Sequence, residues 1–120
     1  MTTPTNPAAL NAALMRECID ACLTCLKACE NCAAACLQEP ELEMFRDCIR
    51  LDRDCADACD LTARLLLRGS DMHPDACRMC AQACAACAAE CERHAHHHEH
   101  CRVCAEACRA CEAACRKLAA

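Results

Sequence analysis

Cysteine is the apolar residue that follows a helical period along most of this 120-residue chain. In the segments 18–36, 77–91 and 101–115, successive cysteines are separated by alternating steps of three and four residues. This spacing places the cysteines of each segment on one stripe of an α-helix, which faces inward in a folded protein. The residues between them are mostly Ala, Glu, Arg, Leu, Lys and Gln, which favour helix. The pattern therefore predicts an all-α protein.

Turn signals divide the pattern into four helices. Asn6 and Pro7 supply an N-cap and a first-turn proline, and Gln38-Glu39-Pro40 separates the first two helices. Gly69 is the expected C-cap of the second helix, and a histidine-rich stretch separates the last two. The expected helices span residues 7–37, 41–68, 74–95 and 98–118.

Short connections between long helices favour antiparallel neighbours. We therefore expect one antiparallel up-down-up-down four-helix bundle domain over residues 1–120, with residues 1–6 as a flexible N-terminus. The chain has one Phe and no Trp or Tyr, so cysteine itself must fill much of the interior, where it behaves as a small hydrophobe. The bundle should have a thiol-lined core. The 19 cysteines, all of them candidate metal ligands, are Cys18, Cys22, Cys25, Cys29, Cys32, Cys36, Cys48, Cys55, Cys59, Cys77, Cys80, Cys84, Cys87, Cys91, Cys101, Cys104, Cys108, Cys111 and Cys115.

A continuous row of thiols needs a chemical reason, because alanine and leucine pack a core without oxidising. Disulfides are one reason, but the cysteine count of 19 is odd and bridges need closely matched separations. Metal binding is the other, since cysteines at i and i+4 have Cβ atoms about 5–6 Å apart. Two thiolates on a linear ion lie about 4.5 Å apart, given a metal–sulfur bond of about 2.3 Å, and a neighbouring helix can add a third sulfur.

Charge and ligand softness favour Cu(I) among the metals. Soft thiolates select Cu(I), and a thiolate with one Cu(I) is neutral, so many ions can be buried together. A zinc site with four thiolates would carry two negative charges. We expect Cu(I) as the cofactor, with multiple ions per chain and on the order of one ion per thiol. A zinc or metallothionein-like thiol buffer stays the alternative, and a helical redox or structural module with disulfides is less favoured.

The remaining composition excludes several classes of function. The net charge of −5 offers no basic face for nucleic acid or anionic lipid, and no run of about 18 apolar residues exists to span a membrane. The N-terminal residues lack the features of an export signal, so we expect a cytoplasmic protein with reduced thiols. No nucleotide-binding loop or distinguished nucleophile indicates an enzyme.

The inward stripes resemble those of the bacterial copper storage proteins, and without an export signal the chain looks like the cytosolic branch of that family. The resemblance covers residues 7–118 and rests on the stripes CIDACLTCLKACENCAAAC, CIRLDRDCADAC, CRMCAQACAACAAEC and CRVCAEACRACEAAC. It implies Cu(I) stored between thiolates in the core of a four-helix bundle, and a homotetramer. It also implies a polar, His-bearing end through which copper enters, and an opposite end closed by apolar residues. The copper donors and acceptors stay unknown.

Histidines should gather where the first helix meets the second and the third meets the fourth. Stepping along the stripe from Cys91 reaches His94, and stepping back from Cys101 reaches His98 and His97. These three histidines are candidate ligands facing the thiols.

The same end of the bundle should also hold two other histidines, an aspartate and a methionine. We expect His96 and His100 to face solvent. Asp52 lies four residues after Cys48, and it is either an inward polar ligand or a residue of a solvated face that leaves Leu51 inside. Met44 is either a thioether ligand at the entrance or a packing residue.

The opposite end should be an apolar plug. His73 is expected to be a simple loop residue there rather than a ligand. The residues that gather at this end are Leu14, Met15, Leu65, Leu66, Met72, His73, Met79 and Leu118.

Overall fold

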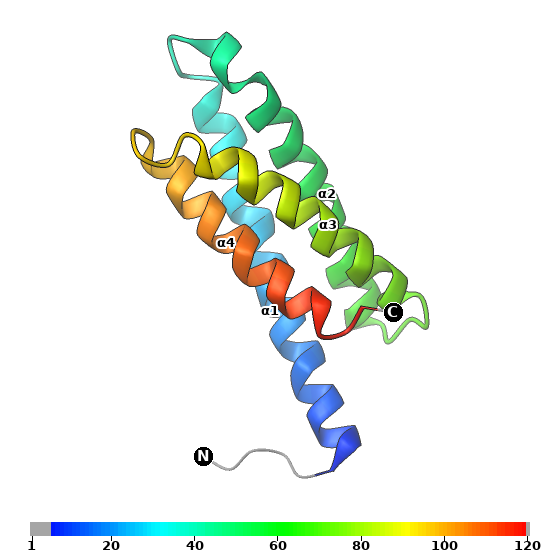
Figure 1. Cartoon of the computed structure of the whole chain (residues 1–120). Coiled ribbons are helices and arrows are strands. Elements are labelled where there is room, and N and C mark those ends of the chain that lie inside the picture. The colour runs from blue at the N-terminus through cyan, green and yellow to red at the C-terminus, as the bar shows by residue number, and fades with distance from the viewer. Residues whose placement is uncertain (1–5, 120) are drawn as a thin grey trace.

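The computed structural model describes residues 6–119 and contains, in that range, four α-helices, a short 3₁₀ turn and no strand (Figure 1). The all-α prediction is therefore confirmed. The elements are α1 (Pro7–Cys36), η1 (Leu42–Phe45), α2 (Arg46–Leu67), α3 (His73–Glu92) and α4 (Glu99–Arg116).

The start of α1 follows the sequence signal. Asn6 has an extended backbone, and its side-chain oxygen accepts a hydrogen bond of 2.7 Å from the backbone N–H of Ala9, while Pro7 begins the helix. The predicted N-cap is confirmed. The flexible N-terminus expected over residues 1–6 lies outside the described residues, apart from the capping residue Asn6.

Two helix boundaries differ from the prediction, both at the same end of the bundle. The expected second helix is divided, because the chain leaving Pro40 first forms η1 and breaks at Phe45, whose φ of −104° and ψ of 5° are not helical. The third helix ends at Glu92 rather than at residue 95. The chain must reverse direction within residues 93–98 to begin α4. Residues 93–95, expected as the last turn of α3, therefore belong to the connection.

The end of α2 depends on the single glycine. Gly69 has a φ of +66°, in the left-handed region, and its N–H donates to the carbonyl of Leu66 at 3.1 Å. The N–H of Ser70 donates to the carbonyl of Leu65 at 2.9 Å, which completes a Schellman motif. The predicted C-cap is confirmed.

The four helices enclose one core. α1 and α3 each pack against both α2 and α4, and the short connections make consecutive helices antiparallel (Figure 1). The first turns of α1 extend beyond the ends of the other helices (Figure 1). All 19 cysteines are fully buried between the helices, with small alanines such as Ala81 and Ala88 beside them. The thiol-lined core is therefore present as expected.

The end of the bundle beyond Cys18, Cys59, Cys77 and Cys115 is only partly the expected plug. Leu65 and Leu66 are buried, Leu14 is half-buried, and Met15 and Leu118 pack against the core.

Three other residues of the expected plug are placed differently. Met72 is wrong as a plug residue, since it is 65% exposed in the turn before α3, and Met79 is exposed on the outer face of that helix. His73 was expected in the loop but is the first residue of α3, and its ring nitrogen Nδ1 lies 2.9 Å from the carbonyl oxygen of Ser70. The inward position of α2 is taken instead by Thr62, which is fully buried and donates to the carbonyl of Ala76 at 3.3 Å.

Candidate metal centre

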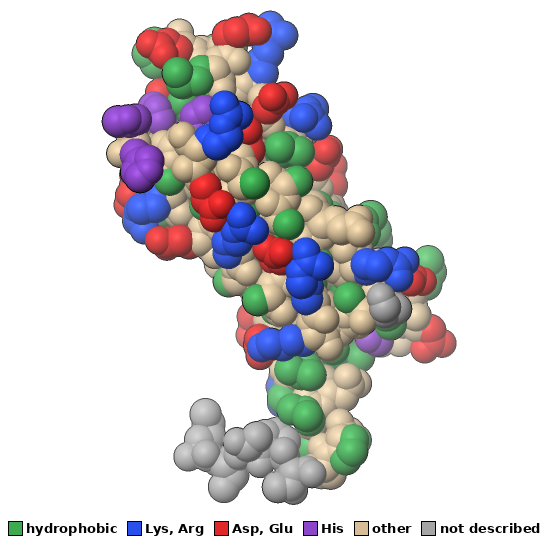
Figure 2. All heavy atoms as spheres, viewed as in Figure 1, with side chains coloured by type: hydrophobic (Ala, Val, Ile, Leu, Met, Phe, Trp, Pro, Cys, Tyr) green, Lys and Arg blue, Asp and Glu red, His purple; other side chains and the backbone are tan. Residues whose placement is uncertain are grey.

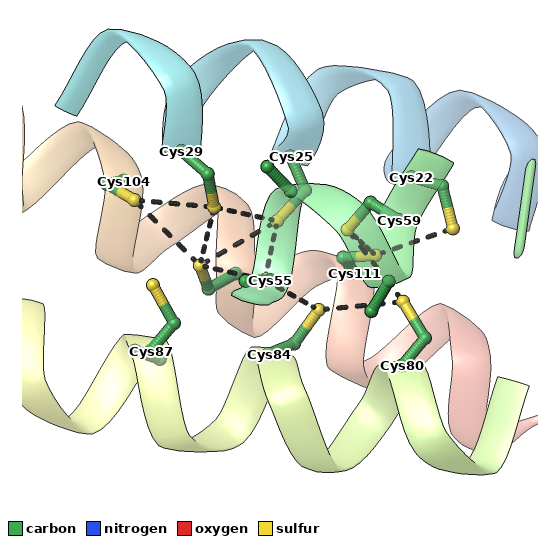
Figure 3. Close-up of a cluster of buried hydrophobic side chains, with 14 of the residues drawn as sticks. Cys22, Cys25, Cys29, Cys55, Cys59, Cys80, Cys84, Cys87, Cys104 and Cys111 are labelled. Atoms are coloured by element: carbon green, nitrogen blue, oxygen red, sulfur yellow. Dashed lines mark hydrogen bonds between the residues drawn. The ribbon is translucent and has the colours of Figure 1, made fainter. Parts of the chain in front are cut away.

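The cysteine side chains point from all four helices into the space between them (Figure 3). Every one of the 19 carries a free thiol, and none is exposed to solvent. We call this row of sulfurs the thiol core. The α-helical period explains it, because alternating steps of three and four residues keep each cysteine on the inward stripe over five turns or more of α1.

Neighbouring sulfurs form triangles in the thiol core. Cys25, Cys29 and Cys108 have Sγ–Sγ separations of 3.8, 3.7 and 3.8 Å, two of the sulfurs coming from α1 and one from α4. Cys55 of α2 adds a fourth sulfur, 3.7 Å from Cys25 and 4.0 Å from Cys108, and lies 3.6 Å from Cys84 of α3. Each of these sulfurs therefore has partners across the bundle, and Cys25 and Cys29 also contact each other on the same helix (Figure 3).

Several groups of four ligand atoms lie close enough to share one ion. Within each group the atoms are within 4.8 Å of one another. Such groups include Cys22, Cys59, Cys80 and Cys111, then Cys25, Cys55, Cys59 and Cys84, and then Cys29, Cys87, Cys104 and Cys108.

The spacing of cysteines along one helix differs from the sequence expectation. The i, i+4 pairs Cys32–Cys36 and Cys111–Cys115 have Sγ separations of 3.9 and 4.0 Å, shorter than the roughly 4.5 Å of a linear two-coordinate ion. A three-coordinate ion with bonds of about 2.3 Å separates its sulfurs by about 4.0 Å. The observed separation of the two sulfurs thus suits a three-coordinate ion, whose third sulfur would come from a neighbouring helix.

Asp52 faces the thiol core rather than a solvated face, and its role as a ligand stays a prediction. Its side chain is fully buried, whereas Leu51 is half-buried. The thiols of Cys87 and Cys104 donate to Oδ1 at 3.1 and 3.3 Å, and longer contacts reach Cys48 and Cys91. Asp52 thus occupies the inward position of α2 between Cys48 and Cys55, where the other helices carry cysteine.

Burial controls the protonation of this carboxyl. Burial removes water from the charged carboxylate and thereby raises the pKa of Asp52 to about 9. At neutral pH the carboxyl is therefore protonated, and the metal-free core around it carries no net charge from this group.

All histidines except His73 gather at one end of the bundle (Figure 2). We call this end, formed by the α1–α2 and α3–α4 connections, the mouth. The histidine of the mouth that contacts the sulfurs is His100, whose Nδ1 lies 3.4 Å from Sγ of Cys32 and 3.5 Å from Sγ of Cys101. Cys36 is 3.9 Å away, and these four residues form another group that could hold an ion.

The expectation that His100 faces solvent is thus wrong, for a reason in the helix start. Stepping back from Cys101 assumed that α4 continues beyond it, but α4 begins at Glu99, with His98 as an N-cap in extended conformation. The chain before His98 leaves the helical path. The available signal was the distance to the next cysteine, since His100 lies four residues before Cys104 and so shares its face.

The three histidines predicted to face the thiols lie elsewhere in the mouth. His94 is buried, but its Nε2 lies 3.0 Å from Glu90 and its ring packs on Phe45 with centroids 4.8 Å apart. His98 packs edge-on against Phe45 and lies 3.5 Å from Glu39. His97 is exposed, as is His96, for which solvent exposure was expected.

Phe45 is the part of the mouth that the sequence reasoning missed. The only aromatic carbocycle of the chain is 1% exposed and packs against the rings of His94, His98 and His100. Met44, beside it on η1, is 52% exposed. It lines an outer pocket together with His94, His97 and His98 rather than a position among the sulfurs. A ligand role for Met44 therefore lacks support from its position.

The raised pKa of Asp52 predicts a pH-dependent stability of the metal-free protein. Between the unfolded pKa near 3.8 and the folded value of about 9, only the unfolded chain releases the proton. Stability from this site therefore falls as pH rises, by up to about 1.4 kcal/mol per pH unit. Asp52→Asn should flatten the fall in unfolding free energy between pH 5 and 8, measured by urea denaturation under reducing conditions. Asp54→Asn, on the exposed face of the same helix, is the control, and equal slopes for both variants would contradict the assignment.

Among residues 6–119, no helix is both long and apolar enough to cross a bilayer.

Comparison with known proteins agrees with the geometry of the thiol core. A cytosolic copper storage protein from Streptomyces lividans, with five coppers, is 49% identical, with a TM-score of 0.89 over 92% of this chain and 95% of that one. Metal-free copper storage protein 3 from Bacillus subtilis is 43% identical, with a TM-score of 0.79 over 88% of this chain and 98% of that one. The sequence profile of the copper storage proteins matches residues 11–120, and the chain belongs to this family.

Proposed function

We propose that this protein stores or buffers copper by binding many Cu(I) ions through the thiolates of its core. The observation that carries the proposal is the set of 19 free, fully buried thiols, whose neighbouring sulfurs lie 3.6 to 4.0 Å apart. Such a row of soft ligands suits Cu(I). Copper-loaded structures of related proteins, including the Streptomyces lividans protein with 10 copper equivalents, support the same conclusion. The proposal includes no catalytic role.

Zinc is the second candidate, and the four-sulfur groups favour it. A tetrahedral ion with bonds of about 2.3 Å separates its sulfurs by about 3.8 Å, which is close to the spacing in the core. Each four-thiolate zinc site, however, would bury two negative charges. The buried polar residues among those described are Asp52, Thr62, Glu90 and His94, and no Lys or Arg is buried to compensate. Cu(I) replaces each proton with an ion of equal charge, so loading leaves the core neutral.

The cellular location and the assembly are part of the same proposal. The related Streptomyces lividans protein is described as cytosolic, and reduced thiols suit that compartment, so we infer a cytoplasmic protein. We also propose a homotetramer, as the family resemblance implies. Exposed Leu61 and Met79, beside Ala58 and Ala83, form the apolar part of a groove between α2 and α3 that a second copy could cover. Two acids of α2, Asp54 and Asp57, also line this groove.

Copper enters, we propose, at the mouth, where His100 meets the outermost thiols. Its Nδ1 and the sulfurs of Cys32, Cys36 and Cys101 provide one nitrogen and three sulfur ligands at the end of the thiol core, and His100 is the partly exposed member of this group. From this layer an ion can pass to Cys104 and Cys29, whose sulfurs are 3.8 Å apart. Asp52, which contacts Cys104, is protonated in the metal-free state and adds no charge that would hold the ion there.

Anaerobic titration tests storage directly. We expect Cu(I) to load to many equivalents, on the order of one per thiol, and the melting temperature to rise with added copper because binding stabilises only the folded state. Competition with chelators of known affinity should show preference for Cu(I) over Zn²⁺. Saturation at one or two ions, or preferential zinc loading, would contradict the proposal.

His100→Ala tests copper entry at the mouth separately from copper binding in the thiol core. We expect uptake of Cu(I), followed by stopped-flow absorbance, to slow by about tenfold because one ligand of the first layer is lost. The final capacity should stay within one equivalent of the wild type, because the thiols are unchanged. His96→Ala, an exposed histidine of the same connection, is the control. Equal rates for the two variants would remove His100 from the entry path.

Sedimentation equilibrium tests the assembly. The wild type should sediment with the mass of four chains of 13.0 kDa. Leu61→Glu should shift the mass toward smaller species, because a charge in an apolar interface is unfavourable, whereas Val103→Glu, also exposed but on α4, should not. A wild-type monomer would contradict the tetramer and leave the copper titration unaffected.

A further inference from the structure

Glu39 joins the two connections that form the mouth. It lies between α1 and η1, and its Oε1 is 3.3 Å from Nε2 of His100 and 3.5 Å from Nδ1 of His98, on the far connection. The three side chains are all partly shielded from solvent, at 23% exposure or less.

The two ring nitrogens of His100 face different chemistry. Nδ1 points at the sulfurs of Cys32 and Cys101, whereas Nε2 points at the Glu39 carboxylate. A neutral imidazole carries one N–H, and a carboxylate can only accept a hydrogen bond. The contact with Glu39 therefore favours the tautomer in which the proton of His100 is on Nε2 and is donated to Glu39. Nδ1 is left with a free lone pair aimed at the outermost thiols.

We propose that Glu39 is a positioning residue for copper capture, holding His100 as the Nε2–H tautomer so that Nδ1 is presented to an ion arriving at Cys32, Cys36 and Cys101. This inference rests on the proposed entry of Cu(I) at the mouth. Carboxylates that accept from the distal nitrogen of a metal-binding histidine fix its ring and increase its basicity as a ligand. Glu39 contacts His100 from the loop between α1 and η1, whereas the thiols are all on helices.

Among residues 6–119, no other carboxylate contacts a ring nitrogen of His100. Glu90 is already paired, with His94 at 3.0 Å and with Arg93 at 2.9 Å. Glu41, two residues from Glu39 on the same connection, is exposed. The contact of Glu39 with His98 fixes the direction of the carboxylate, and His98 is in turn held by its edge-on packing on Phe45 at 4.8 Å.

A double-mutant cycle separates positioning from a general effect on the loop. Glu39→Ala should slow Cu(I) uptake by about tenfold, with capacity unchanged. In a His100→Ala background the same substitution should have no further effect, because the group through which Glu39 acts is gone. In a His98→Ala background the effect should persist. Glu41→Ala is the matched control and should keep the wild-type rate. Slowing by Glu39→Ala that survives in the His100→Ala background would overturn the proposal.

The tautomer is measured without copper, so its outcome is independent of the storage function. ¹⁵N NMR of the metal-free, reduced protein should show His100 protonated at Nε2 and unprotonated at Nδ1. In Glu39→Ala the Nδ1–H form should increase, because Nδ1–H can then donate to the Cys32 sulfur. A wild-type His100 protonated at Nδ1 would overturn the inference even if copper loads fully. If the protein fails to load copper while His100 shows the expected tautomer, the proposed function fails and the positioning of the ring stands.

Discussion

Sulfur atoms occupy the interior of this bundle where leucine side chains fill a typical one, and they must stay free of net charge to remain there. A buried thiolate without a partner is unfavourable, and the core contains no lysine or arginine to compensate one. Protonated thiols satisfy the constraint in the metal-free state, and so does a carboxyl at Asp52 whose pKa is raised to about 9. Any ion that replaces the protons must leave the same neutrality, which restricts what the fold can store.

The same constraint divides the molecule into two ends. At the end near Cys18 and Cys115, the inward position of α2 is Thr62, whose hydroxyl is satisfied by a backbone carbonyl, and Leu66 closes the core beyond it. At the mouth, the polar groups are arranged in pairs, with the part-buried Glu39 beside His100 and the buried Glu90 beside the buried His94. Each polar group there has a polar partner, and His100 is the residue that reaches from Glu39 to the sulfurs.

The sequence was sufficient for the parts of the structure that depend on local periodicity. The cysteine stripes, the Asn6 cap and the Gly69 cap each follow from one residue type at one spacing, and all agree with the structure. The mouth was not predictable in the same way, because its geometry depends on where helices stop. Extending the stripe beyond Cys91 and Cys101 assumed continuous helix, whereas the reversal of the chain turns His97 outward and brings His100 inward. Asp52 was ambiguous because spacing alone allows an inward acid, and only its thiol neighbours decide the matter.

Geometry by itself does not choose the metal, and this is where charge decides. Separations such as 3.7 Å between Cys25 and Cys108 and 4.0 Å between Cys80 and Cys84 are close both to the roughly 3.8 Å of a tetrahedral site and to the roughly 4.0 Å of a trigonal one. Four sulfurs are close enough in several groups to accept zinc. One four-thiolate zinc site would be tolerable at a surface, but a row of them would add two charges per ion inside a core with no counterion. Cu(I) exchanged for protons one by one adds none, so the number of ions can grow with the number of thiols. The absence of buried cations, more than the arrangement of the sulfurs, is what makes this core suited to Cu(I).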